Sequence, residues 1–265
     1  MSVFLLSAGT LWKREIVRFL RQRSRIIGTP GQPILFWLLL GLGFGESFRP
    51  SGAGASGGYL EYFYPGILVM VVLFTAIFAT IAVVEDRKER FLQAVLVAPV
   101  PRAAIVLGQA LGATTLALLQ GFILLAAAPF AGVPLMAASA AAAGGVMFLI
   151  GFSLTSLGLA FAWRMESTQG FHSIMNLVLL PLWILSGAVF PVASAHPWLG
   201  WVMKINPLAY GVAWLRRALY AAQPESLADL TQADLPEVGI SLAVTVVFGS
   251  IAFLVAVRHA EKSDG

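Results

Sequence analysis

Cysteine is absent from this sequence of 265 residues, and charged residues make up only 11% of it. The lack of cysteine excludes disulfides, thiolate metal sites and cysteine nucleophiles. The scarcity of charge excludes most water-soluble domains, in which about 25% of the residues are charged. It also excludes a disordered chain, which needs high charge and low hydrophobicity. Since 58% of the residues are hydrophobic, we predict an all-α polytopic membrane protein.

Long runs without a charged residue indicate the membrane spans, because one helix needs about 20 residues to cross the hydrocarbon. Five such runs cover residues 26–45, 62–84, 103–163, 167–203 and 238–257. The third run is long enough for two spans, which a break at residues 129–134 separates. Prolines interrupt the fourth run, which predicts one span at about residues 170–190 and then a segment that dips back without crossing. We therefore expect six transmembrane helices in a single domain, 1–265.

Lysine and arginine are unequally distributed between the two sides of these spans. If the N-terminus lies inside, thirteen of the 17 basic residues fall in inner segments, and the outer ones hold only Arg49, Lys204, Arg216 and Arg217. The positive-inside rule then places both termini in the cytoplasm, with the chain in a cytoplasmic (inner) membrane. The excess of lysine and arginine on the inner side, where they face membrane lipid, also explains a pI of about 9.7, so no nucleic-acid partner is needed.

Residues 8–30 predict an amphipathic connecting helix ahead of the first span. Arg14, Arg18, Arg21 and Arg25 share one helical face, whereas Trp12 lies on the opposite one. Such a helix lies in the membrane interface, with its arginines toward lipid phosphates or water. We interpret it first of all as an anchor.

The predicted cytoplasmic segment 85–102, between spans two and three, joins six consecutive charges to apolar residues at helical spacing. Its candidate functional residues are Glu85, Asp86, Arg87, Lys88, Glu89, Phe91, Leu92, Leu96, Pro99 and Arg102. A charge run is usually a solvated connector, but a short helix with an apolar face suits a groove on a partner protein. We favour docking, because this face has no evident packing partner within the chain.

The predicted outer region 191–222 contains a clear helix start, since Asn206 can cap a helix and Pro207 suits its first turn. The helix that follows carries aromatic residues and Arg216, and Trp198 and Trp201 precede it. These residues predict an aromatic, basic belt at the outer interface. Interfacial anchoring and substrate contact both explain such a belt.

Catalysis has little support in the sequence. Ser153 and His172 loosely match an intramembrane serine protease, but Leu154 stands where the usual Gly-x-Ser-Gly motif has glycine. Ser153 and its small neighbours fit a helix-packing face better. The chain also lacks a Gly-x-x-x-x-Gly-Lys-Ser/Thr loop for ATP phosphates. Its spans lack the midplane charge that ion-coupled carriers usually keep, so we expect the energy for any transport to come from elsewhere.

Three segments together resemble the membrane subunit of type-2 ABC exporters, a family that moves drugs, lipids or glycans outward. The first, residues 85–109, is similar to the family's coupling-helix loop, although residues 87–90 lack a glycine that many members have. The second is similar to its Ser-Gly-x-x-x-Pro stretch at the end of span five, and the third to its Asn-Pro-Leu helix. The matching residues of these two are Ser186, Gly187, Pro191, Asn206, Pro207 and Tyr210.

This resemblance implies a connecting helix, six spans and re-entrant helices between spans five and six. It implies a unit of two membrane subunits, this chain with a second copy or a homologous permease, and two ABC ATPase subunits that hold ATP and Mg. The chain itself would carry no catalytic, metal or cofactor site and would form the path for an amphipathic, lipid-like or glycan substrate. A self-sufficient channel or secondary carrier, and an intramembrane serine hydrolase, are the alternatives.

Overall fold

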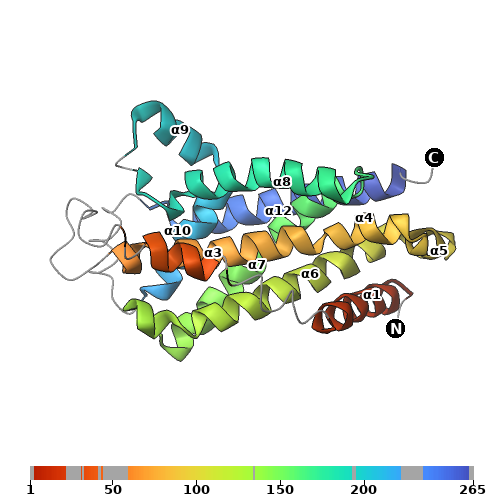
Figure 1. Cartoon of the computed structure of the whole chain (residues 1–265), viewed down its shortest axis with the longest axis horizontal. Coiled ribbons are helices and arrows are strands. Elements are labelled where there is room, and N and C mark those ends of the chain that lie inside the picture. Colours follow the sequence, from red (N-terminus) through yellow and green to blue (C-terminus); the bar gives the residue numbers. More distant parts are fainter. Residues whose placement is uncertain are drawn as a thin grey trace.

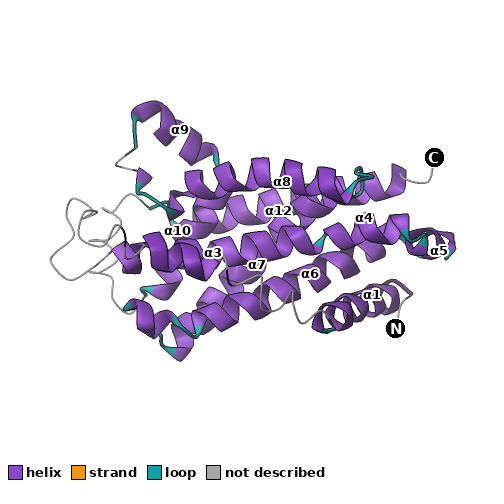
Figure 2. Cartoon of the chain, in the orientation of Figure 1, coloured by secondary structure: helices purple, strands orange, loops and turns teal. Residues whose placement is uncertain are grey.

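The fold is a bundle of long helices (Figures 1 and 2). It was obtained as a computed structural model, which describes residues 3–21, 31, 33–40, 43, 59–133, 135–192, 195–221 and 235–262. The described part of the chain contains helices and no strand. Helices suit a membrane because they satisfy their own backbone hydrogen bonds where no water is present.

The long helices run roughly along the long axis of the bundle, and the short ones lie toward its two ends (Figure 1). The α-helices are α1 (Val3–Leu20), α3 (Tyr59–Ala79), α4 (Ile81–Lys88), α5 (Phe91–Val97), α6 (Arg102–Leu125), α7 (Ala137–Ala162), α8 (Thr168–Trp183), α9 (Pro197–Ile205), α10 (Pro207–Leu219) and α12 (Val238–Glu261). A 3₁₀ turn, η1 (Ala128–Ala131), follows α6, and a π-helical turn, η2 (Ile184–Ala188), extends α8. We call one end of the bundle the α5 end, where α1 starts and α12 finishes, and the opposite end the α9 end.

Five of the six expected spans are present as helices long and apolar enough to cross a membrane. They cover residues 59–88, 102–125, 137–162, 168–188 and 238–261. Half of the first expected span, residues 26–45, lies outside the described residues, and residues 33–40 are helical. The break predicted at residues 129–134 is confirmed, since α6 ends at Leu125 and α7 begins at Ala137.

Helix α3 lies at the centre of the bundle and contacts α6, α7 and α8. Its residues are apolar on all sides, and from Phe63 to Leu73 almost every side chain is fully buried. A helix that is hydrophobic all round is stable only inside other helices. At its far end α3 continues through Thr80 into α4, so that the two helices form a single span ending at Lys88.

Small residues set how closely the helices approach each other. Gly108 and Gly112 lie four residues apart on α6, and a Cβ built on Gly108 would lie 2.6 Å from the Ala8 carbonyl oxygen of α1. This small-xxx-small spacing lets α1 pack directly along α6. On α7, the Ser153 hydroxyl lies 2.7 Å from the Leu149 carbonyl and 3.1 Å from the Thr245 carbonyl of α12. Its packing role is thereby confirmed.

Candidate functional site

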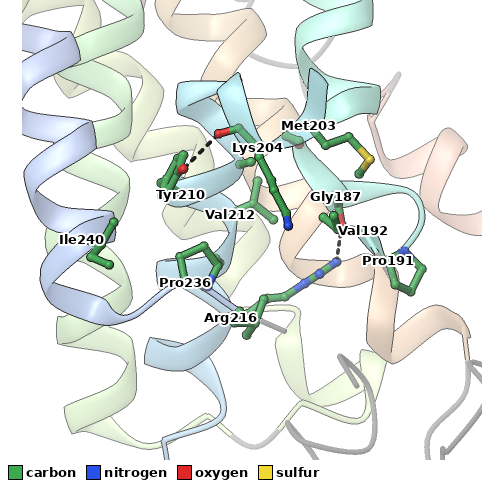
Figure 3. A pocket seen from close by; sticks show the side chains of 14 residues that line it. Gly187, Pro191, Val192, Met203, Lys204, Tyr210, Val212, Arg216, Pro236 and Ile240 are labelled. Carbon is green, nitrogen blue, oxygen red and sulfur yellow. Dashed lines mark hydrogen bonds between the residues drawn. The ribbon is translucent and has the colours of Figure 1, made fainter. Parts of the chain in front are cut away.

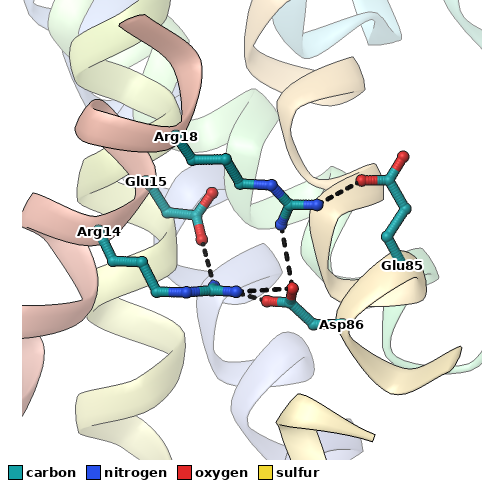
Figure 4. A network of polar contacts seen from close by, with 5 residues as sticks. All are labelled: Arg14, Glu15, Arg18, Glu85 and Asp86. Atoms are coloured by element: carbon teal, nitrogen blue, oxygen red, sulfur yellow. Dashed lines mark hydrogen bonds and ion pairs between the residues drawn. The ribbon is translucent and has the colours of Figure 1, made fainter. Parts of the chain in front are cut away.

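An ion-pair cluster joins α1 to the end of α4 at the α5 end (Figure 4). The Arg14 guanidinium donates to both carboxylate oxygens of Asp86, over 2.7 and 2.8 Å. Arg18 donates to Asp86 over 3.0 Å and to Glu85 over 2.7 Å. The Asp86 side chain is only 1% exposed, so two arginines neutralise a carboxylate that is otherwise out of water.

This cluster corrects two sequence-based expectations. Arg14 and Arg18 do not point toward lipid phosphates or water, because carboxylates about 70 residues away in the chain hold them. The connecting helix also starts earlier than expected, at Val3, and its described part ends at Leu20. Residues 22–30 of the expected range lie outside the described residues. The spacing of Arg14 and Arg18 places both on one helical face, but no pattern in the sequence identified Glu85 and Asp86 as their partners.

With Glu15, the cluster contains one carboxylate more than it has guanidinium groups. It lies 3.1 Å from Arg14 and is 9% exposed, where α1 packs on α6. Burial raises the pKa of the Glu15 carboxyl above its usual range, although the neighbouring Arg14 opposes this shift. The hydrogen bond to Asp86 raises the pKa of Arg14. Arg14 therefore keeps its charge, while Glu15 binds a proton more readily than an exposed glutamate does.

The predicted segment 85–102 does not begin as a loop. Residues 85–88 are the last turn of α4, and Arg87 donates to the carbonyl oxygens of Trp163 and Met165 over 2.6 and 3.3 Å. Lys88 and Glu89 are exposed. Three of the six charged residues in this run, Glu85, Asp86 and Arg87, therefore bind other residues of the same chain.

The apolar face of α5 also differs from the expectation that it has no packing partner. Leu92 is 2% exposed and belongs to the core of the bundle. Phe91 is 36% exposed, and the Arg14 guanidinium lies over its ring, 3.9 Å from the centroid. The side chain of Leu96 lies outside the described part of the chain. What α5 offers outward is Val97, which is 86% exposed, followed by the exposed Pro99.

Arg90 joins α4 to α5 with a left-handed backbone, at φ 60° and ψ 5°. Among the described residues it is the only one besides glycine with a positive φ. The sequence lacks the glycine expected in this region, and here a residue with a Cβ adopts the conformation that glycine favours. After α5 the chain turns through Pro99 and Pro101, and Arg102 begins α6.

The α9 end is organised around a break in α8. Helix α8 passes into the turn η2, where Gly187 has a φ of 77°. The Ser186 hydroxyl donates to the Trp183 carbonyl over 2.6 Å. The side chain of Asn206 donates to the Leu182 carbonyl over 2.7 Å and accepts from the Leu208 amide over 3.0 Å. Asn206 is therefore the expected cap of α10, and it also ties α10 to the end of α8.

Arg216 is buried rather than part of a surface belt, and this is a correction. Its side chain is 4% exposed and donates to the carbonyl oxygens of Gly187 and Tyr62 over 2.9 and 3.3 Å. Its guanidinium also lies 4.1 Å from the centroid of the Tyr62 ring. The aromatic part of the expected belt does lie at the surface, since Trp198 and Trp201 on α9 are 64% and 71% exposed.

A cavity of about 280 Å³ lies between η2, α9 and α10 (Figure 3). Four of the six residues predicted for this region line it, namely Ser186, Gly187, Pro191 and Tyr210. The Tyr210 hydroxyl donates to the Lys204 carbonyl over 2.9 Å and closes the corner between α9 and α10. Helices α9 and α10 have 9 and 13 residues, too few to cross a bilayer.

Comparisons with known proteins agree with this architecture. The family described as ABC-2 type transporter matches residues 7–220. A transport permease named ycf38 from Cyanophora paradoxa is 27% identical over 258 residues, which cover 95% of this chain and 88% of the relative.

Two further relatives come from bacteria. Nodulation protein J from Rhizobium leguminosarum bv. trifolii is 28% identical, with 81% of this chain and 84% of the relative covered. The inner membrane transport permease YadH from Escherichia coli (strain K12) is 24% identical, with 82% and 84% covered. Since the family match spans most of the bundle, from α1 to the end of α10, the chain belongs to the ABC-2 type transporter family as a membrane permease subunit.

Proposed function

We propose that this chain is the membrane subunit of an ABC exporter that separate ATPase subunits drive. The working unit would contain two ATPase subunits, which hold ATP and Mg, and two permeases, this chain with a second copy or a homologous permease. The cargo would be amphipathic, lipid-like or a glycan. Membership of the ABC-2 type transporter family supports this assignment, and the name transport permease is shared by relatives that align over most of the chain.

The observation that carries the proposal is the placement of α5. This helix lies at one end of the bundle (Figure 1) and presents Val97 outward. It follows directly on the span formed by α3 and α4, and ion pairs tie that junction to α1. A force applied to α5 therefore acts on the central span and on α1 together. Such a joint suits the transfer of an ATPase movement to the transport path.

A single exposed residue gives a direct test of docking. Val97→Asp puts a charge into the proposed contact without disturbing the fold, because Val97 is 86% exposed. If α5 fits into an ATPase groove, the unpaired charge costs several kcal/mol there, and binding weakens more than tenfold. We expect loss of co-purification with the ATPase and loss of stimulated ATP hydrolysis in nanodiscs.

The matched control is Lys262→Asp, an exposed change just beyond α12 at the same end of the bundle. It should leave both readouts unchanged, and both variants should keep the parent's thermal unfolding midpoint. If Val97→Asp retains partner binding and stimulated hydrolysis, α5 is a plain connector and the proposal fails.

The proposed orientation places both termini and the α5 end in the cytoplasm. The distribution of lysine and arginine supports it. Because the chain has no cysteine, single cysteines can be labelled without background. An impermeant maleimide on intact cells should label cysteine at Met136, between α6 and α7, but not at Glu166 or Lys262. The reverse pattern would overturn the orientation.

A further inference from the structure

The cavity at the α9 end brings two cations together within largely apolar walls. Figure 3 shows Lys204 extending from α9 toward Arg216 of α10, with Val212 and Met203 beside them. Lys204 is exposed, whereas Arg216 is buried. The site thus has one cation that water can reach and a second cation held deeper in the protein.

The positive charge of Arg216 is solvated only in part by the protein. Its terminal nitrogen donates to backbone carbonyls, which are neutral, and its buried Nε has no hydrogen-bond partner. Among the described residues that line the cavity, none is acidic. An anion that reaches this wall therefore meets the charge of Arg216 without a competing carboxylate from the described lining.

Helix α9 divides the surroundings of the cavity into two environments. Met203 and Lys204 face the cavity, while Trp198, Trp201 and Ile205 are 64%, 71% and 78% exposed. Tryptophan and apolar residues on the outside of a short helix are typical of the membrane–water interface. A molecule with a charged head in the cavity can therefore lay an apolar tail along α9.

We propose that this cavity binds the anionic headgroup, phosphate or carboxylate, of an amphiphile. The volume of about 280 Å³ lies just below the roughly 300–1,000 Å³ of pockets that enclose whole small molecules, so it holds a headgroup and leaves the tail outside. Lys204 and Arg216 supply the charge. A zwitterionic headgroup binds less well, because no described lining residue offers a carboxylate to its cationic part.

The test uses the purified full chain, freed of lipid in a neutral detergent. Short-chain phosphatidylglycerol is the anionic probe and short-chain phosphatidylcholine the zwitterionic one, and calorimetry measures both affinities. We expect phosphatidylglycerol to bind at least about tenfold more tightly, since a charge-assisted hydrogen bond contributes about 1.5–3 kcal/mol. Lys204→Gln should remove most of this preference, because the exposed side chain can change without loss of fold.

Two further variants test the cavity itself. Ala209→Trp fills it from α10 and should weaken both lipids, with the thermal unfolding midpoint as the check on folding. Lys262→Gln, at the α5 end, removes the same kind of charge and should change neither affinity. Equal affinity for the two lipids in the parent, or an unchanged preference in Lys204→Gln, would overturn the proposal.

The amphiphile has two possible sources, the cargo or a resident lipid of the bilayer. In vesicles containing the chain and its ATPase, ATP-driven movement of labelled phosphatidylglycerol that Lys204→Gln abolishes would identify it as cargo. Binding without such movement would identify it as a resident lipid, and either result keeps the headgroup site. Only the measurement of ATP-driven lipid movement rests on the proposed function, because calorimetry needs no ATPase.

Discussion

The two ends of the bundle hold their arginines in opposite ways. At the α5 end, Arg14 and Arg18 bind the carboxylates of Asp86 and Glu85, so the charges nearly cancel. At the α9 end, Arg216 binds backbone carbonyls, and its charge is left uncancelled. A cancelled cluster suits the mechanical joint that we propose for the α5 end, whereas an uncancelled charge beside a cavity suits the proposed ligand site.

The difference also follows from where each set of residues lies in the chain. The partners at the α5 end come from separate helices, α1 and α4, so their ion pairs hold two elements together. Arg216 of α10 likewise reaches other elements, the carbonyls of Gly187 in η2 and Tyr62 in α3, but neither supplies a counter-charge. Its contact with Gly187 fixes the shape of a cavity wall.

The largest expected effect is at Asp86. Asp86→Asn keeps the shape of the side chain but leaves two guanidinium groups without their shared counter-charge. Removing one partner of a buried ion pair costs about 3 kcal/mol, and we expect that loss in the free energy of unfolding in detergent.

The neighbouring Glu85→Gln is the matched control, because the Glu85 side chain is 34% exposed. An exposed ion pair is worth less than about 1 kcal/mol. If the two variants lose the same stability, Asp86 is not the centre of the joint.

A smaller loss is expected at Arg216. Arg216→Ala removes its contact with the Tyr62 ring and its hydrogen bonds, at a cost of about 2 kcal/mol. The Gly187 carbonyl keeps one donor, the Tyr62 hydroxyl at 2.9 Å, which limits the effect. Arg216→Lys retains the charge but not the planar fork, so its unfolding midpoint should fall between those of the parent and Arg216→Ala. If Arg216→Lys is no more stable than Arg216→Ala, the planar fork of the guanidinium, and not its charge, accounts for the stability that Arg216 contributes.

Much of this fold follows from local sequence patterns. Uncharged runs predicted five of the described spans, because a lipid-facing helix must exclude charge over its whole length. The pair Asn206 and Pro207 predicted the start of α10, because a cap depends only on neighbouring residues. These features require no knowledge of tertiary structure.

Contacts between distant residues explain what the sequence did not reveal. Periodicity placed Arg14 on a polar helix face, but nothing local indicated that Asp86, 72 residues later, would meet it. Arg216 lies on a helix that the sequence placed at the interface. Its burial depends on the turn at Gly187, whose carbonyl accepts its hydrogen bond. Leu92 belongs to a short amphipathic turn, yet it packs into the core of its own chain. Docking of segment 85–102 and the re-entrant character of residues 191–222 stay predictions.

The smallest expected effect concerns the two left-handed positions, Gly187 at one end and Arg90 at the other. A residue with a Cβ loses about 1–2 kcal/mol in this conformation, and glycine loses about 0.5–1 kcal/mol through its greater freedom in the unfolded chain. Arg90→Gly should therefore raise the free energy of unfolding by up to about 1 kcal/mol. Gly187→Ala should lower it by up to about 1 kcal/mol, and no clash adds to this loss, because a Cβ there meets only ordinary contacts, at 3.8 Å and beyond. Opposite signs in chemical denaturation are the expected result, and a loss of stability in Arg90→Gly would mean that the arginine side chain holds the turn between α4 and α5.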